Sequence, residues 1–203
     1  MMLSKIELIR KTYDPLSNNE LLMYHLLKSH TVVSFKKNDI ILKKNQIMDA
    51  YYIIESGYMR STVENFDNEE VTIEFFKSDD IAFDVVSLFQ NTPSQITLEA
   101  ITDVRCLKLS FNEFLNFYQQ YPDFSEWGRN WMTSAYLKLR KRTISMATHT
   151  AMYRYLEFIT EMPEIHKDVP LKHIASFLGV TDTSLSRLRR SKMLYSGNRQ
   201  NQF

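Results

Sequence analysis

Residues 171–190, LKHIASFLGVTDTSLSRLRR, carry the most specific structural pattern in the sequence. Two short helices that cross at a tight turn need a glycine there, because glycine adopts a left-handed backbone without steric cost. Gly179 stands at that position. Small or apolar residues are needed where the helices touch, and they are present as Ile174, Ala175, Leu178, Val180, Leu185 and Leu188. The pattern predicts a helix-turn-helix, although other helix pairs joined by a glycine turn match several of these positions.

The second helix of this pair has a polar outward face. Thr181 is a suitable N-cap for it. Short hydroxyl and carboxylate side chains come first on the helix and arginines follow. Such side chains can read the edges of bases in the DNA major groove and hold phosphates. The predicted DNA-binding residues are therefore Thr181, Asp182, Thr183, Ser184, Ser186, Arg187, Arg189 and Arg190.

Charge is divided unevenly along the chain, although the net charge of the whole sequence is only +1. Residues 1–128 hold 12 Lys and Arg against 19 Asp and Glu, a net −7, whereas 129–203 hold 13 against 5, a net +8. A basic C-terminal part attached to an acidic body is typical of a phosphate-binding module. Chance clustering on solvated helices produces the same asymmetry.

Residues 31–109 differ in texture from the rest of the chain. They hold short runs rich in β-branched and aromatic residues: TVVSF, DIILK, AYYIIES, YMRSTVE, EVTIEFF, ITLEAI and VRCLKLS. Turn signals separate the runs, and short strands at regular spacing predict an antiparallel sandwich or barrel. Residues 84–93, DVVSLFQNTP, do not alternate and predict a short helix or loop between two strands.

Helices are predicted on both sides of the strands. Leucines at helical spacing predict one helix over 15–29. Ser110 and Glu113 form a capping box that opens another through FNEFLNFYQQ, which ends before Pro122.

A long helix is predicted next, through EWGRNWMTSAYLKLRKRTISMA. Arg142 interrupts an apolar stripe at heptad-like intervals, made of Met132, Ala135, Leu139 and Met146. Such a stripe forms the seam between paired helices, or it packs against the helix's own domain. A further helix is predicted through TAMYRYLEFITEM, and two prolines bracket a short connector, PEIHKDVP. The domain boundary is expected near Ala147.

This order of elements, ending in IASFLGVTDTSLSRLR, resembles the Crp/Fnr family of bacterial transcription regulators. The resemblance covers about residues 20–190 and includes KKNDIILKKNQIMDAYYIIESGYMR in the opening strands. It implies an α+β protein with an antiparallel, double-stranded β-helix-like β-roll over 1–123, similar to a cyclic-nucleotide-binding domain and acting as a sensor. A dimerisation helix over 124–146 and a helix-turn-helix domain over 147–203 follow. It also implies a homodimer that binds a two-fold symmetric double-stranded DNA operator through 182–187, with RNA polymerase as a further partner.

The chain departs from the family in its nucleotide cassette. The family has a Gly-Glu pair followed about ten residues later by an Arg, which neutralises the phosphate. This chain has Phe83-Asp84 and then Ser94-Gln95, with no Lys or Arg in 78–104. A cyclic phosphate at these four candidate ligand-binding residues meets net repulsion, unless Arg60 or the long helix supplies a cation. The effector is therefore expected to be something other than cyclic AMP, and its identity is unknown.

A second departure lies at the C-terminus. The family follows its second helix with a β-hairpin wing, whereas only SKMLYSGNRQNQF, 191–203, follows here. A reduced wing is expected, with Lys192 and Arg199 available to contact the DNA backbone.

Other chemistry is poorly supported by the residues. The five histidines have no metal-ligand spacing, a lone Cys106 in an apolar run is expected to be a core residue, and no motif of a catalytic site occurs. We therefore expect no metal, no cofactor and no enzymatic activity. No apolar run approaches the roughly 20 residues of a membrane span, and the first residues become charged too soon for a secretory signal, so the protein is expected in the cytoplasm. The alternative to a DNA-binding regulator is a small-molecule- or protein-binding module whose helix-turn-helix makes a protein contact.

Overall fold

The computed structural model describes residues 4–190. Contacts between residues divide the chain into two compact units. One unit contains the residues up to Val63 together with Ile73–Leu137, and the other contains Glu64–Thr72 and the residues from Lys138 onward. This division into units does not test the domain boundary predicted near Ala147, which stays a prediction.

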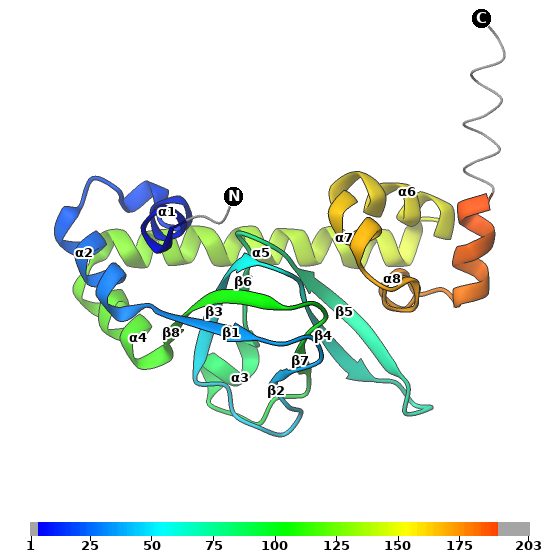
Figure 1. Ribbon diagram of the computed structural model, residues 1–203, viewed down its shortest axis with the longest axis horizontal. Helices are drawn as coiled ribbons and strands as arrows, with labels where there is room; N and C mark the ends of the chain where they lie inside the picture. The colour runs from blue at the N-terminus through cyan, green and yellow to red at the C-terminus, as the bar shows by residue number, and fades with distance from the viewer. Residues whose placement is uncertain (1–3, 191–203) are drawn as a thin grey trace, which may run out of the picture. The chain divides into compact units, whose positions relative to one another are not determined.

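Antiparallel strands form two four-stranded sheets in the described chain (Figure 1). The first sheet has the order β1 (Thr31–Phe35), β8 (Val104–Ser110), β3 (Ala50–Ser56) and β6 (Ile81–Ala82). The second has the order β2 (Ile40–Leu42), β7 (Thr97–Ala100), β4 (Met59–Glu64) and β5 (Glu70–Phe76). All seven predicted runs are strands, and the two-residue β6 is the strand that the sequence pattern missed.

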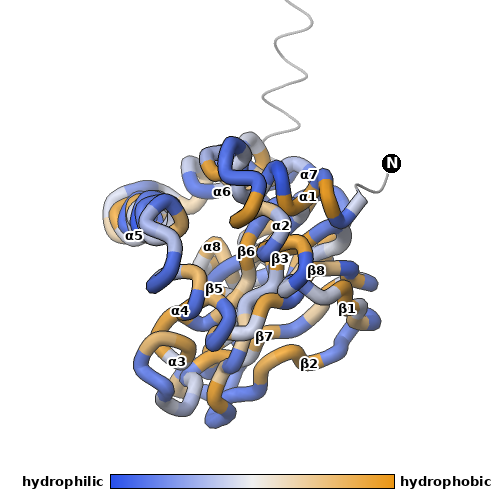
Figure 2. Tube along the Cα trace, turned by 90° about the vertical axis from the view of Figure 1, so that its left-hand side faces the viewer, coloured by the Kyte–Doolittle hydropathy of each residue, from blue (hydrophilic) through white to orange (hydrophobic). Residues whose placement is uncertain are grey.

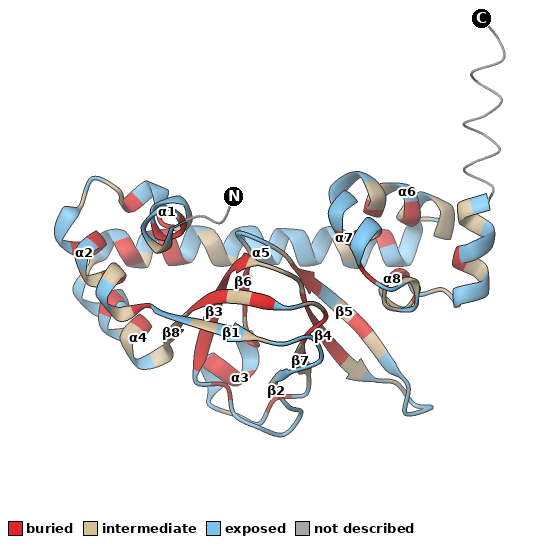
Figure 3. Cartoon of the chain, viewed as in Figure 1, coloured by how far each residue is buried: buried red, intermediate tan, exposed pale blue. Residues whose placement is uncertain are grey.

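Burial explains why these runs are strands. In β8 buried and half-buried side chains alternate for most of its length. Along the strands the trace changes between hydrophobic and hydrophilic residues (Figure 2), and buried residues concentrate on the strands of the roll (Figure 3). One core cluster contains Ile54, Leu98 and Cys106, and a second joins the sheet to the N-terminal helices through Tyr51 and Leu107. Cys106 is fully buried, and burial raises the pKa of its thiol to about 12, as expected of a core residue.

The helices around the roll differ in part from the prediction. They are α1 (Lys5–Thr12), a 3-10 turn at Asp14–Leu16, α2 (Glu20–Ser29), α3 (Val85–Gln90), α4 (Phe111–Gln120) and α5 (Pro122–Thr148). The predicted helix over 15–29 begins only at Glu20, where Asn19 caps it. α1, which opens with a Ser4–Glu7 capping box, was not predicted.

The capping box predicted at Ser110 forms only in half. The Ser110 hydroxyl accepts a hydrogen bond from the Glu113 backbone N–H at 3.3 Å. The Glu113 carboxylate accepts instead from the hydroxyl of Ser29, at 3.1 Å. A tertiary partner has replaced the local one.

The second unit contains the end of α5, then α6 (Ala151–Glu161), α7 (Pro163–Asp168), α8 (Leu171–Leu178) and a further helix over 182–190. The predicted connector PEIHKDVP is wrong in part, because residues 163–168 are helical. Pro163 is at the start of α7, where its missing N–H costs no hydrogen bond.

Candidate functional site

The turn between α8 and the 182–190 helix has the predicted geometry. Gly179 adopts φ 65° and ψ 40°, the left-handed conformation that ends a helix at low cost when the residue is glycine. The Thr181 hydroxyl accepts a hydrogen bond from the Ser184 backbone N–H at 3.2 Å and so caps the second helix. Ile174, Leu178 and Leu185 are buried where the two helices pack. A helix-turn-helix is thus present in the described chain.

Most of the predicted DNA-binding residues are exposed to solvent. Six of them are exposed: Thr181, Asp182, Thr183, Ser186, Arg187 and Arg190. Ser184 and Arg189 are half-buried. Burial raises the pKa of the Tyr155 hydroxyl on α6, and the nearby charge of Arg189 opposes this shift in part. The terminal segment 191–203, in which the reduced wing was predicted, lies outside the described residues.

Some of the basic side chains of this unit form ion pairs or hydrogen bonds within the unit. Lys141 on α5 pairs with Glu157 on α6 at 3.0 Å and also with Glu161, and both hydrogen bonds raise the lysine pKa. Arg142 and Arg154 donate to backbone carbonyls of α8. These contacts were missed by the sequence analysis because a count of charges cannot distinguish a free cation from one held by a neighbouring helix.

α5 is unusually exposed along its middle. Residues 133–141 are exposed without interruption, which means on every side of the helix (Figure 3). Several of the exposed side chains are large and apolar, with Tyr136, Leu137 and Leu139 each about 60% exposed. Met132, at the start of the predicted stripe, is half-buried instead. Exposed apolar side chains of this kind favour association with another apolar surface.

The cassette residues of the β-roll are brought together only in part. Asp84 caps α3 by accepting from the Val86 N–H at 3.1 Å. Its other carboxylate oxygen accepts a hydrogen bond from the Ser94 hydroxyl at 2.6 Å, and both side chains are buried. Gln95 is exposed. Phe83 contributes to a different space, described below.

The cation that could compensate for the missing arginine has another partner. Arg60 on β4 is 4% exposed and forms an ion pair with Glu99 on the adjacent strand β7. Its charge therefore balances an acid of the roll. In the sequence Arg60 is a possible phosphate ligand, and the ion pair with Glu99 argues against that role.

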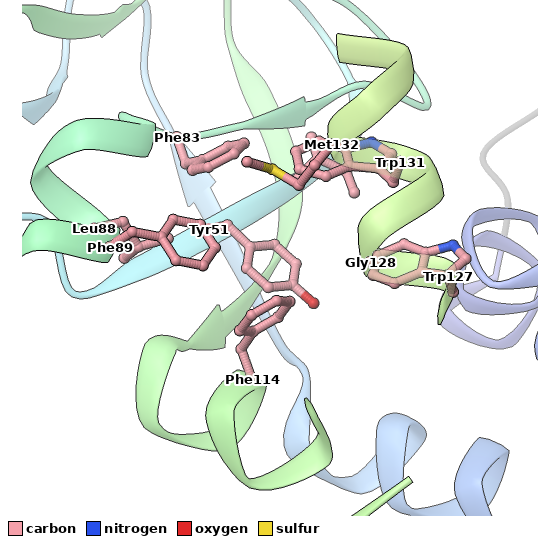
Figure 4. A pocket seen from close by; sticks show the side chains of 10 residues that line it. Tyr51, Phe83, Leu88, Phe89, Phe114, Trp127, Gly128, Trp131 and Met132 are labelled. Carbon is pink, nitrogen blue, oxygen red and sulfur yellow. The ribbon is translucent and has the colours of Figure 1, made fainter. Parts of the chain in front are cut away.

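A small apolar cavity lies between the roll and the first turns of α5 (Figure 4). Almost all of its wall is carbon, from Tyr51, Ile81, Phe83, Leu88, Phe89, Phe114, Trp127, Gly128, Trp131 and Met132. Phe83 packs against Trp131 with the ring centres 5.2 Å apart. None of Asp84, Ser94 and Gln95 lines this cavity. Four of the lining residues, Trp127, Gly128, Trp131 and Met132, belong to α5, and no pattern in the sequence indicated that this helix contributes to a cavity.

The polar end of Tyr51 is satisfied away from the cavity. Its hydroxyl lies 2.5 Å from that of Tyr13, which lies 3.1 Å from Nε2 of the buried His30. His30 Nδ1 lies 2.8 Å from the Leu26 carbonyl, so that nitrogen carries the proton and Nε2 accepts. Burial lowers the pKa of His30 to about 4. The imidazole is neutral, and the network fixes the wall of the cavity.

Two further observations concern the described residues alone. No cluster of His, Cys, Asp or Glu among them has the geometry of a metal site. None of their helices combines the length and the apolar character needed to cross a bilayer.

Known proteins share features of this chain, both in sequence and in fold. Residues 32–121 match the family model of the cyclic nucleotide-binding domain. No curated protein sequence matches the chain.

Solved structures extend the likeness to most of the chain. FixK2 from Bradyrhizobium japonicum has 19% identity and a TM-score of 0.69, with 83% of this chain and 86% of that chain covered. The c-di-GMP-responsive regulator CLP of Xanthomonas campestris has 15% identity and a TM-score of 0.68 over 88% and 93%. A Crp/Fnr-family protein from Eubacterium rectale has 17% identity and a TM-score of 0.70 over 90% and 88%. The resemblance to the Crp/Fnr family, and the predicted β-roll, long helix and C-terminal helices, are confirmed at the level of the fold.

Proposed function

We propose that the protein is a homodimeric transcription regulator of the Crp/Fnr type that binds DNA in a sequence-specific manner and has no enzymatic activity. The observation that carries the proposal is the helix over 182–190, named here the recognition helix. It is capped by Thr181, seated by buried Leu185, and exposes hydroxyl groups and Arg187 on its outer face. Such a helix fits the major groove, where arginine pairs with guanine and hydroxyls contact several bases.

Dimerisation is proposed through α5. A single recognition helix reads too few base pairs for useful specificity, and paired helices double the site. The apolar side chains of Leu137 and Leu139 on the exposed stretch 133–141 offer the contact surface. Burying them between two copies removes apolar area from water, which favours association. The operator is then two-fold symmetric, with RNA polymerase as a further partner of the complex.

The sensor is proposed to respond to an uncharged, apolar effector. A cyclic nucleotide needs a cation for its phosphate, whereas Ser94 is bonded to Asp84 and Arg60 to Glu99. The cavity beside Phe83 and Trp131 has a wall of carbon atoms, which accepts apolar surface and penalises charge.

The test is an electrophoretic mobility shift on the DNA upstream of the protein's own coding sequence, repeated with random-sequence DNA of the same length. A regulator shifts the first at lower concentration, and its affinity falls linearly with the logarithm of the salt concentration. Failure to shift either DNA at low salt contradicts the proposal and favours a protein- or small-molecule-binding module.

A further inference from the structure

The backbone carbonyls at the C-terminal end of α8 accept hydrogen bonds from outside the helix. The last four carbonyls of a helix have no partner within it. In α8 they are those of Ala175, Ser176, Phe177 and Leu178. The turn satisfies the first two, through the Val180 N–H at 3.0 Å and the Gly179 N–H at 3.1 Å. The other two accept hydrogen bonds from arginines.

Arg154 on α6 holds the last of these carbonyls. Its Nε and Nη2 both donate to the Leu178 carbonyl, at 3.1 and 3.0 Å. Its Nη1 donates to the His149 carbonyl at 2.7 Å. One guanidinium therefore joins the junction of α5 and α6 to the turn that precedes the recognition helix. The planar fork of arginine is suited to such a contact, and a lysine ammonium is not.

Arg142 on α5 holds the other carbonyl. Its Nη2 donates to the Phe177 carbonyl at 2.7 Å. The guanidinium also lies over the Phe177 ring, 4.3 Å from the centre, and that ring packs against Phe158 with the ring centres 5.6 Å apart. A cation at the C-terminal end of a helix also opposes the negative end of the helix dipole.

These contacts converge one and two residues before Gly179, the turn after which the recognition helix starts. A helix that reads base edges must be held firmly, because bidentate pairing tolerates little displacement. We propose that Arg142 and Arg154 are positioning residues for DNA recognition, which fix the turn and so the angle of the recognition helix, and that neither contacts phosphate. This inference rests on the proposed DNA-binding function. Two of the basic residues of 129–203, Arg142 and Arg154, are then not available to contact phosphate.

The experiment uses the full-length protein and two DNA duplexes, one selected from random sequences for binding to the wild type and one of scrambled sequence. Affinities for both are measured over a range of salt concentrations for the wild type, Arg154→Met and Arg154→Lys. Lys167→Met is the matched control, because Lys167 is an exposed cation on α7 of the same unit. The thermal unfolding midpoint of each variant is recorded.

We expect Arg154→Met to lower the ratio of selected to scrambled affinity by about tenfold, the loss typical of one misread base pair. We expect the salt slope to stay unchanged and Arg154→Lys to recover part of the ratio. Lys167→Met leaves the ratio unchanged. A merely structural role reduces the folded fraction, which lowers both affinities equally and keeps the ratio constant, and that outcome overturns the proposal.

A decrease of about one in the salt slope also overturns it, because a lost phosphate contact has that effect. If Arg154→Met does not fold, Arg142→Met and Arg142→Lys repeat the test on the second carbonyl. Wild-type protein that does not distinguish the two duplexes contradicts the proposed function itself. A discriminating wild type with an unchanged ratio in the variants contradicts only the role of the arginines.

Discussion

Ser94 donates a hydrogen bond of 2.6 Å to the carboxylate of Asp84, and both side chains are buried. The resemblance to the Crp/Fnr family predicts the acidic residue of the nucleotide cassette at Asp84 and its arginine at Ser94. Here the hydroxyl of Ser94 and the carboxylate of Asp84 satisfy each other. A buried polar pair of this kind is stable because neither group is left without a partner.

Cyclic AMP and cyclic GMP are therefore expected to bind weakly or not at all and to leave DNA affinity unchanged. The absence of a charge-assisted hydrogen bond costs about 1.5 to 3 kcal/mol, or roughly 10- to 150-fold in affinity. Isothermal titration calorimetry measures this directly. Micromolar binding of cyclic AMP contradicts the expectation, as does a structure in which its phosphate contacts a cation.

Arg187→Ala is expected to weaken binding to the specific operator by about 1 to 3 kcal/mol and to relax discrimination at one base pair. The reason is that Arg187 is exposed on the recognition helix, where it can pair with guanine through two hydrogen bonds. Competition binding against a set of single-base operator variants measures both effects. An equal loss on specific and random DNA assigns Arg187 to phosphate contact.

Leu139→Glu is expected to prevent formation of the proposed homodimer. Leu139 is 62% exposed on α5, and a carboxylate in a paired-helix seam is buried without a partner. Multi-angle light scattering measures the mass. Ile6→Glu, at an exposed apolar position of α1, is the control and keeps the dimer. A wild-type monomer at micromolar concentration that still binds DNA refutes the dimer.

Xenon is expected to quench the tryptophan fluorescence in a saturable manner. Both tryptophans of the chain, Trp127 and Trp131, line the cavity, and xenon is a small apolar probe for a cavity with an apolar wall. Met132→Phe should fill the cavity and abolish saturation, whereas Met132→Leu, which keeps the volume, should preserve it. Linear quenching that is the same in all three proteins indicates collision with exposed rings and no accessible cavity.

Stability is expected to fall in acid through His30. Its pKa is about 4 in the folded protein and about 6.5 when exposed, so the unfolded chain takes up a proton first as the pH falls. The contribution is complete above pH 6.5 and is lost between about pH 6.5 and 4, with a total near 3 kcal/mol. Urea unfolding at several pH values measures it. His30→Gln should flatten this part of the profile, and identical profiles for both proteins refute the assignment.

The parts of the fold that could be predicted from the sequence are those set by residues close together in the chain. The helix-turn-helix was readable because Gly179 and the spacing of Ile174, Leu178 and Leu185 depend on neighbours in the sequence. The strands were readable for the same reason, since alternation follows from the pleat of the chain. α7 was missed because short helices are stabilised mainly by packing, which periodicity over a few residues does not reveal. α1 was missed although its Ser4–Glu7 capping box is a local signal.

In the candidate site, too, local features could be read from the sequence, whereas contacts between distant segments could not. The polar outward face of the recognition helix and the absence of Lys and Arg from 78–104 could be read from the sequence, because both are statements about residue type at a position. The contact of Ser94 with Asp84, the pairing of Arg60 with Glu99 and the α5 wall of the cavity arise only when distant segments are brought together. Only the tertiary structure decided that Arg142 and Arg154 bind the carbonyls of α8, because a backbone acceptor leaves no mark in the sequence.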